Sequence, residues 1–140
     1  MSPPRRPAHA VTVDVDVAFS QCDPLGVVWH GRYFEFFEAA RTALLRSIDL
    51  DVGRIRELGF RMLVTEARCR YMAPLAYGDV ARVSAWFGQT APLIRVSYDI
   101  YNATDGRWSC RAATVLATTD ASGTLLASTP DAILERLSAR

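Results

Sequence analysis

Residues 21–38 read QCDPLGVVWHGRYFEFFE, and this stretch decides how the rest of the chain is arranged. It begins as a turn, because Asp23 precedes Pro24 and Gly26 follows two residues later. It ends as the start of a helix, and a short apolar run and His30 lie between the two. The sequence therefore predicts an ordered loop that carries a carboxylate and an imidazole to a helix N-terminus. Such an end offers unpaired N–H groups and a partial positive charge, which suit a developing oxyanion.

The helix that follows is predicted to be buried. Residues 32–47 lack Gly and Pro and are rich in Phe, Ala, Leu and Glu. The polar side chains at helical spacing share one stripe, formed by Glu35, Glu38, Thr42 and Arg46. A helix that is apolar around most of its circumference is wrapped by other elements and does not lie on a surface.

Strand patterns supply the wrapping. Apolar and polar residues alternate, or small residues dominate, over residues 9–19, 63–71, 80–87, 94–100 and 107–119. Shorter helices are predicted over 51–58 and 130–137. The order of elements predicts an α+β fold in which one long helix lies on a face of a five-stranded antiparallel sheet. One face of such a sheet covers only part of this helix, so we expect a second copy of the chain to cover the rest.

Composition limits the class of protein. With 140 residues, of which 50% are hydrophobic, the chain predicts a single domain over residues 9–140. Residues 1–8 carry two arginines and no apolar segment behind them, which predicts a disordered N-terminal tail and not a signal peptide. The sequence contains no run of 18 apolar residues, so no membrane span is predicted. A net charge of +1 gives no electrostatic field that would attract nucleic acid or a membrane.

The cysteines indicate a compartment. Cys22, Cys69 and Cys110 are odd in number, scattered and without a C-x-x-C pair. This usage argues against a disulfide framework and against a zinc site. It favours a reducing environment, so we expect a cytoplasmic location. A nucleophilic role for Cys22 beside Asp23 lacks the partner pattern that such a thiol needs.

Two segments carry a family resemblance. Residues 19–41, FSQCDPLGVVWHGRYFEFFEAAR, resemble the opening motif of the hotdog-fold acyl-CoA thioesterases of the 4-hydroxybenzoyl-CoA thioesterase type. Residues 71–79, YMAPLAYGD, resemble the segment that joins the second and third strands of that family. The likeness extends over about residues 11–120. It implies a hotdog fold, with the sheet wrapped around the central helix, and dimers or tetramers with active sites at the subunit interface.

The resemblance also implies roles for particular residues. Asp23 matches the catalytic carboxylate of the family, which acts as a nucleophile or as a general base on water. His30 matches the position whose backbone N–H polarises the thioester carbonyl. Gly31, Arg32 and Tyr33 match positions along the entrance for the acyl and pantetheine groups. The plain alternatives are a turn cap for Asp23 and a packing role for His30.

One departure from the family pattern concerns the acyl pocket. Pro24 and Leu25 stand where many relatives have a smaller pair, which predicts a narrower or reshaped pocket. Arginines at 32, 68 and 70 either reach coenzyme A phosphates or lie on solvated faces.

We therefore predict a thioesterase that hydrolyses an acyl-CoA or acyl carrier protein thioester, without a metal or cofactor. The sequence contains no G-x-S-x-G motif, so the serine-hydrolase route to the same reaction is not indicated. A hotdog hydratase or dehydratase is an alternative, although its Asp and His usually stand closer than the seven positions between Asp23 and His30. A non-catalytic module that binds acyl thioesters is another. The sequence leaves open the acyl group, the choice between coenzyme A and carrier protein, and the choice between dimer and tetramer.

Overall fold

A five-stranded antiparallel sheet and one long helix make up most of the chain. The computed structural model describes residues 5–140. Its elements are β1 (Val11–Asp16), α1 (Tyr33–Arg46), α2 (Val52–Glu57), β2 (Phe60–Tyr71), β3 (Val80–Gln89), β4 (Ile94–Asn102), β5 (Arg107–Asp120) and α3 (Asp131–Ser138). Short 3-10 turns cover Phe19–Gln21 and His30–Arg32. No helix within residues 5–140 is long and apolar enough to cross a membrane.

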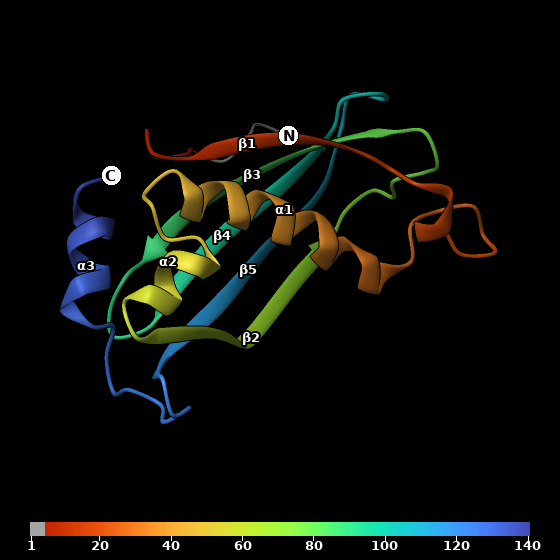
Figure 1. The fold of residues 1–140 in the computed structure, drawn as a ribbon. Helices are drawn as coiled ribbons and strands as arrows, with labels where there is room; N and C mark the ends of the chain where they lie inside the picture. The colour runs from red at the N-terminus through yellow and green to blue at the C-terminus, as the bar shows by residue number, and fades with distance from the viewer. Residues whose placement is uncertain (1–4) are drawn as a thin grey trace.

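The sheet has the strand order β1-β3-β4-β5-β2, and every neighbouring pair is antiparallel. Figure 1 shows the strands curving behind α1, which lies along one face of the sheet, with α2 and α3 gathered near its C-terminal end. The α+β hotdog arrangement predicted from the sequence is thereby confirmed.

The helix α1 supplies the centre of the core. Phe36, Phe37, Ala40 and Leu44 are all 1% exposed or less. The ring of Phe37 packs against that of Tyr98 on β4, with 5.0 Å between centroids. Burial of each large apolar side chain contributes about 1.5–3 kcal/mol before entropy is counted. The predicted polar stripe faces outward at its acidic and basic positions, because Glu35, Glu38 and Arg46 are exposed.

The strand β2 forms one edge of the sheet and has an unusual exposure. Residues 63–68 are exposed on both faces of the strand, where a half-buried strand would alternate. Leu63 and Val64, which point to opposite faces, are each 42% exposed. Its partner on one side is β5, and the register shifts between Val64 and Glu66. An edge of this kind presents unpaired backbone groups to solvent or to another chain.

The first strand is shorter than the sequence predicts. Its alternation extends to Phe19, but β1 ends at Asp16 and Phe19 is 76% exposed. The Ala18 N–H donates to Oε1 of Gln21 at 2.8 Å, which closes a tight turn and takes the chain off the sheet edge. Residues 9–19 therefore include a strand and the turn that follows it.

A residue that precedes the predicted domain, Arg6, contacts the sheet. Of the segment 1–8 predicted as a disordered tail, residues 1–4 lie outside the described residues. Arg6 donates three hydrogen bonds to the Asp99 carboxylate on β4, at 3.1 Å from Nε and at 2.7 and 2.8 Å from Nη2. Asp99 is fully buried, and this burial raises the pKa of its carboxyl, while the Arg6 guanidinium acts in the opposite direction.

Replacing this arginine should destabilise the fold in a pH-dependent manner. We expect Arg6→Met to lower the free energy of unfolding by about 1–3 kcal/mol at neutral pH, because Asp99 is left buried without its main partner. The pKa of Asp99 is raised in the folded state, so folding favours its protonated form. The loss should therefore be smallest at acidic pH and grow as pH rises through the folded pKa. Urea unfolding at several pH values measures this. Arg5→Met, on an exposed neighbour, is the control, and an equal loss at all pH values would contradict the assignment.

Candidate active site

The loop before α1 is a hydrogen-bonded turn. The Asp23 N–H donates to the Val27 carbonyl and the Gly26 N–H donates to the Asp23 carbonyl, both at 2.9 Å. The Asp23 side chain closes the turn further, because its Oδ1 accepts from the Leu25 N–H at 2.8 Å. Gly26 has φ +82°, a conformation that side chains disfavour. The turn predicted from Asp23, Pro24 and Gly26 is present, and it fixes one carboxylate oxygen.

One backbone hydrogen bond attaches this loop to the chain after β2, and another closes the loop on itself. The Val28 N–H donates to the Leu75 carbonyl at 2.8 Å, and the Trp29 N–H donates to the Gln21 carbonyl at 3.0 Å. Val28 and Leu75 are both buried. The loop is therefore held by the body of the domain as well as by its own turn.

The 3-10 turn His30–Arg32 leads into α1. The Tyr71 hydroxyl, at the end of β2, donates to the His30 carbonyl at 2.6 Å. The first N–H groups of such a turn have no acceptor within it. The Trp29 ring lies over Gly31, where an added Cβ would come within 2.1 Å of the indole. The turn is thus clamped from the sheet side and covered from the other.

Two tyrosines form the wall between this turn and the sheet. Tyr33 is 3% exposed, and its hydroxyl accepts from the Leu75 N–H at 3.1 Å. The ring centroids of Tyr33 and Tyr71 lie 5.0 Å apart. Burial raises the pKa of both phenols, and for Tyr71 the neighbouring Cys69 thiol adds to this effect. Both hydroxyls are therefore neutral hydrogen-bonding groups at physiological pH.

These elements surround a pocket of about 310 Å³ at the N-terminal end of α1, which we call the Asp23 pocket. It is lined by Asp23, Val27, Val28, His30, Tyr33, Tyr71, Met72, Ala73 and Pro74. The structure thus brings together Asp23, His30 and Tyr33, three of the five residues that the sequence singled out. Gly31 and Arg32 do not line the pocket, and the Arg32 guanidinium is paired with Glu35 at 2.8 Å.

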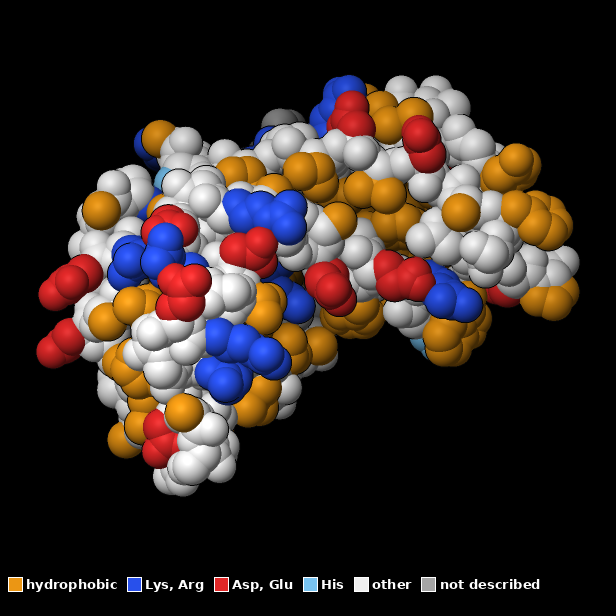
Figure 2. All heavy atoms as spheres, in the orientation of Figure 1, with side chains coloured by type: hydrophobic (Ala, Val, Ile, Leu, Met, Phe, Trp, Pro, Cys, Tyr) orange, Lys and Arg blue, Asp and Glu red, His pale blue; other side chains and the backbone are white. Residues whose placement is uncertain are grey.

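Apolar side chains are exposed around this site. Figure 2 shows hydrophobic side chains gathered on the loop beyond the N-terminal end of α1. Phe19, Leu25 and Tyr77 are 76%, 84% and 65% exposed. Leu25, predicted to narrow or reshape the acyl pocket, is not among the residues of this chain that line the Asp23 pocket. Exposed apolar groups in this number are typical of a surface that another molecule covers.

Comparison with known proteins gives the family. The sequence matches the family described as the Thioesterase-like superfamily over residues 17–137. The chain belongs to this superfamily. Relatives with curated sequences include a "Putative esterase" of Aquifex aeolicus (strain VF5), 39% identical over 48% of this chain and 52% of that protein. Another is the "Putative acyl-CoA thioesterase YneP" of Bacillus subtilis (strain 168), 28% identical over 67% of this chain and 69% of that protein. The first match therefore spans about half of the relative's length.

Solved structures share the superfamily's fold. A hypothetical protein from Aquifex aeolicus is 28% identical, with a TM-score of 0.81 over 91% of this chain and 98% of that one. The DHNA-CoA thioesterase from Staphylococcus aureus has a TM-score of 0.82 at 21% identity, over 93% and 89% of the two chains. A 4-hydroxybenzoyl CoA thioesterase mutant complexed with 4-hydroxybenzoyl CoA has a TM-score of 0.81 at 20% identity, over 92% and 99%. At such identities the last two likenesses establish the fold alone.

Tyr71 is a polar residue of the site that the sequence analysis did not single out. It lines the pocket and holds the His30 carbonyl. Its position at the end of a strand, in the second segment of the family resemblance, was a usable signal. Its contact with His30, however, joins residues 41 positions apart, and no local pattern reports such a contact.

The close contact over Gly31 gives a test of the turn. We expect Gly31→Ala to displace the Trp29 ring, because the new methyl group overlaps it, and to cost about 1–3 kcal/mol of stability. Tryptophan emission and urea unfolding measure both effects. Gly53→Ala is the matched control, since its Cβ meets nothing within 4 Å in α2 and should stabilise the helix by up to about 1 kcal/mol. Stability changes of the same sign in both variants would contradict this geometry.

Proposed function

We propose that this chain hydrolyses an acyl thioester, of coenzyme A or of an acyl carrier protein, in the Asp23 pocket. The observation that carries the proposal is that the Asp23 carboxylate and the first turn before α1 line the same pocket. Membership of the Thioesterase-like superfamily supports it, as do relatives and structural neighbours whose names are those of acyl-CoA thioesterases.

The oxyanion of the reaction belongs at the helix end. Attack on the thioester carbonyl places negative charge on its oxygen, and we assign the backbone N–H of His30 to stabilise that charge. One preorganised donor of this kind is worth about 3 kcal/mol. The partial positive charge of the α1 N-terminus acts in the same direction. The Tyr71 hydroxyl supports this role indirectly, because it holds the His30 carbonyl and thereby the orientation of the turn.

The Asp23 carboxylate supplies the second contribution. Its Oδ1 accepts from the Leu25 N–H, which leaves Oδ2 to face the substrate. As a general base, Asp23 takes a proton from the water that attacks the carbonyl carbon. As a nucleophile, it forms an acyl anhydride that water then cleaves. In either route the C–S bond breaks and the thiolate leaves readily, so a strong general acid is not required.

The remaining candidate residues border the pocket. The exposed His30 ring lies 4.6 Å from the Trp29 ring, so we assign it to the wall of the pocket and not to proton transfer. Tyr33 forms the buried wall. We place Gly31 and Arg32 at the entrance, where a side chain at 31 would compete with Trp29 for space.

We further propose that the working form is a homodimer, or a tetramer built from it, with β2 as the shared edge. Residues 63–68 are exposed on both faces, as expected for a strand that a partner strand and partner side chains cover. A two-fold axis pairs a strand with its own copy in the antiparallel sense. Exposed apolar residues beside the pocket, including Phe19 and Tyr77, support coverage by a second molecule.

Substitution of Asp23 tests the chemistry. We expect Asp23→Asn to lower kcat by about 10²–10⁴-fold on an acyl-CoA panel, measured by release of free thiol. Asn keeps the oxygen that accepts from Leu25, so the turn should persist. Asp120→Asn is the matched control, because Asp120 also accepts backbone N–H groups in a turn and lies outside the pocket. Comparable turnover by Asp23→Asn would refute the mechanism. Water addition to an enoyl thioester without thiol release would favour a hydratase, and binding without turnover would favour a binding module.

Substitution on the edge strand tests the assembly. We expect Val64→Lys to weaken self-association about tenfold or more, because it places like charges opposite each other across the two-fold axis. Analytical ultracentrifugation measures the association. Asp16→Lys, on the opposite edge strand β1, should leave the association unchanged. A dimer that is as stable in Val64→Lys as in the parent chain would place the interface elsewhere.

A further inference from the structure

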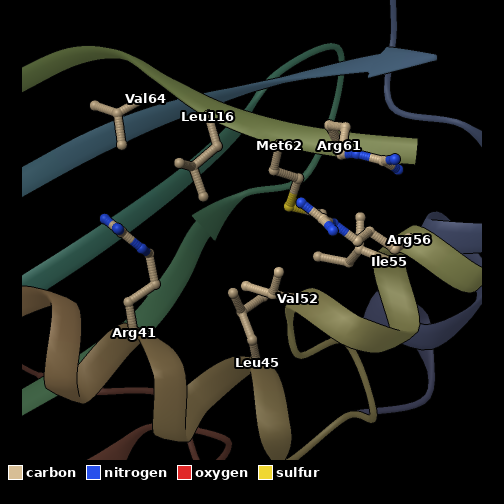
Figure 3. A pocket seen from close by; sticks show the side chains of 9 residues that line it. All are labelled: Arg41, Leu45, Val52, Ile55, Arg56, Arg61, Met62, Val64 and Leu116. Atoms are coloured by element: carbon tan, nitrogen blue, oxygen red, sulfur yellow. The ribbon is translucent and has the colours of Figure 1, made fainter. Parts of the chain in front are cut away.

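A second pocket lies between α1, α2 and the first half of β2, and its side chains are drawn in Figure 3. Its volume is about 300 Å³, which is at the small end for ligand pockets. Its apolar lining consists of Leu45, Val52, Ile55, Met62, Val64 and Leu116. It shares no lining residue with the Asp23 pocket.

Three arginines complete the lining of this second pocket. They are Arg41 on α1, Arg56 on α2 and Arg61 on β2, and no Asp or Glu lines the pocket with them. Within residues 5–140, none of the three forms an ion pair with a carboxylate. The neighbouring arginines differ, since Arg46 is paired with Asp51 and Arg54 with Glu57, among others. Within the described residues, the positive charge that lines this pocket therefore has no carboxylate partner.

Arg41 is held in place by neutral groups. Its Nη1 donates to the Tyr98 hydroxyl at 3.3 Å, and that hydroxyl is hydrogen-bonded to the Thr114 hydroxyl at 2.7 Å. Tyr98 and Thr114 are 1% and 2% exposed, and Arg41 itself is half-buried. A partly desolvated cation without a counter-ion is costly, and an anionic ligand group would offset that cost.

The arginines flank the apolar surface. In Figure 3 the side chain of Arg41 rises from α1 toward the sheet on one side of Leu45, and that of Arg56 reaches from α2 toward Met62 on the other. Arg61, the third arginine of the lining, donates to the Phe60 carbonyl at 2.8 Å. An apolar body with a terminal anionic group fits such a lining, because both kinds of contact are then satisfied.

We infer that this second pocket binds the acyl part of the thioester and selects acyl groups that carry a carboxylate away from the thioester carbon. The inference rests on the proposed function and on the β2-paired dimer. In an antiparallel pair, the Phe60 end of one β2 lies beside the Tyr71 end of the other. Tyr71 lines the Asp23 pocket, whereas Arg61, Met62 and Val64 line the second pocket. The second pocket of one copy therefore continues the Asp23 pocket of its partner.

Binding of two non-hydrolysable coenzyme A thioethers tests the inference without catalysis. One carries a hexyl chain, and the other a carboxypentyl chain of the same length that ends in a carboxylate. By isothermal titration calorimetry with the full chain, we expect the carboxylate form to bind about tenfold or more tightly. Arg41→Met and Arg56→Met should each reduce this preference, and the double variant should abolish it.

Arg54→Met is the control, because Arg54 is paired with Asp49 and Glu57 and does not line the pocket. It should keep the full preference. Arg56 is exposed, so Arg56→Met tests the inference even if Arg41→Met folds poorly. Equal binding of the two thioethers, or a preference that survives the double variant, would overturn this inference and leave the proposed function intact. Failure of both thioethers to bind would overturn the two together.

Discussion

Burial of α1 is the constraint on which the rest of the structure depends. Phe36, Phe37, Ala40 and Leu44 need apolar cover, and the curved sheet supplies it from one side. Because the helix is fixed in this manner, its N-terminal end is fixed as well. The loop that precedes it must then approach the sheet where the chain leaves β2, and that approach creates the Asp23 pocket. Site and core are consequences of the same packing.

The edge strand β2 connects the two pockets of the molecule. One end of it contributes Tyr71 to the Asp23 pocket, and the other contributes Arg61 and Met62 to the second pocket. Its middle is exposed on both faces. Because β2 lines a pocket at each of its ends and has an exposed edge between them, it is suited to join two copies of the chain into one longer site. In the proposed dimer, antiparallel pairing places the Arg61 end of each β2 beside the Tyr71 end of the other.

Much of the fold is readable from the sequence, and the reasons are local. The expected helix over 32–47 differs from α1 by one residue at each end, because continuous apolar periodicity without Gly or Pro has few other solutions. Asp23, His30 and Tyr33 were predictable as neighbours because a single turn and the start of a helix separate them. The prediction that the first strand extends to Phe19 is wrong. Apolar and polar residues continue to alternate beyond Asp16, but the hydrogen bond from the Ala18 N–H to the Gln21 side chain turns the chain away.

What the sequence could not give depends on distant contacts. The hydrogen bond from Tyr71 to His30 and the ion pair from Arg6 to Asp99 span 41 and 93 positions. The second pocket draws on α1, α2, β2 and β5, and its arginines look like ordinary solvated residues in any local window. Which arginines lack a carboxylate partner depends on how all of these elements pack against one another.

The contact between Arg6 and Asp99 also bears on where the domain begins. The strands and helices found within residues 5–140 lie between residues 11 and 138, so a fragment that starts at Val11 would keep each of them. It would nevertheless remove the guanidinium that neutralises a carboxylate at the centre of the sheet. A shortened chain designed from the strand limits alone would therefore fold with the Asp99 carboxylate buried and without its arginine partner.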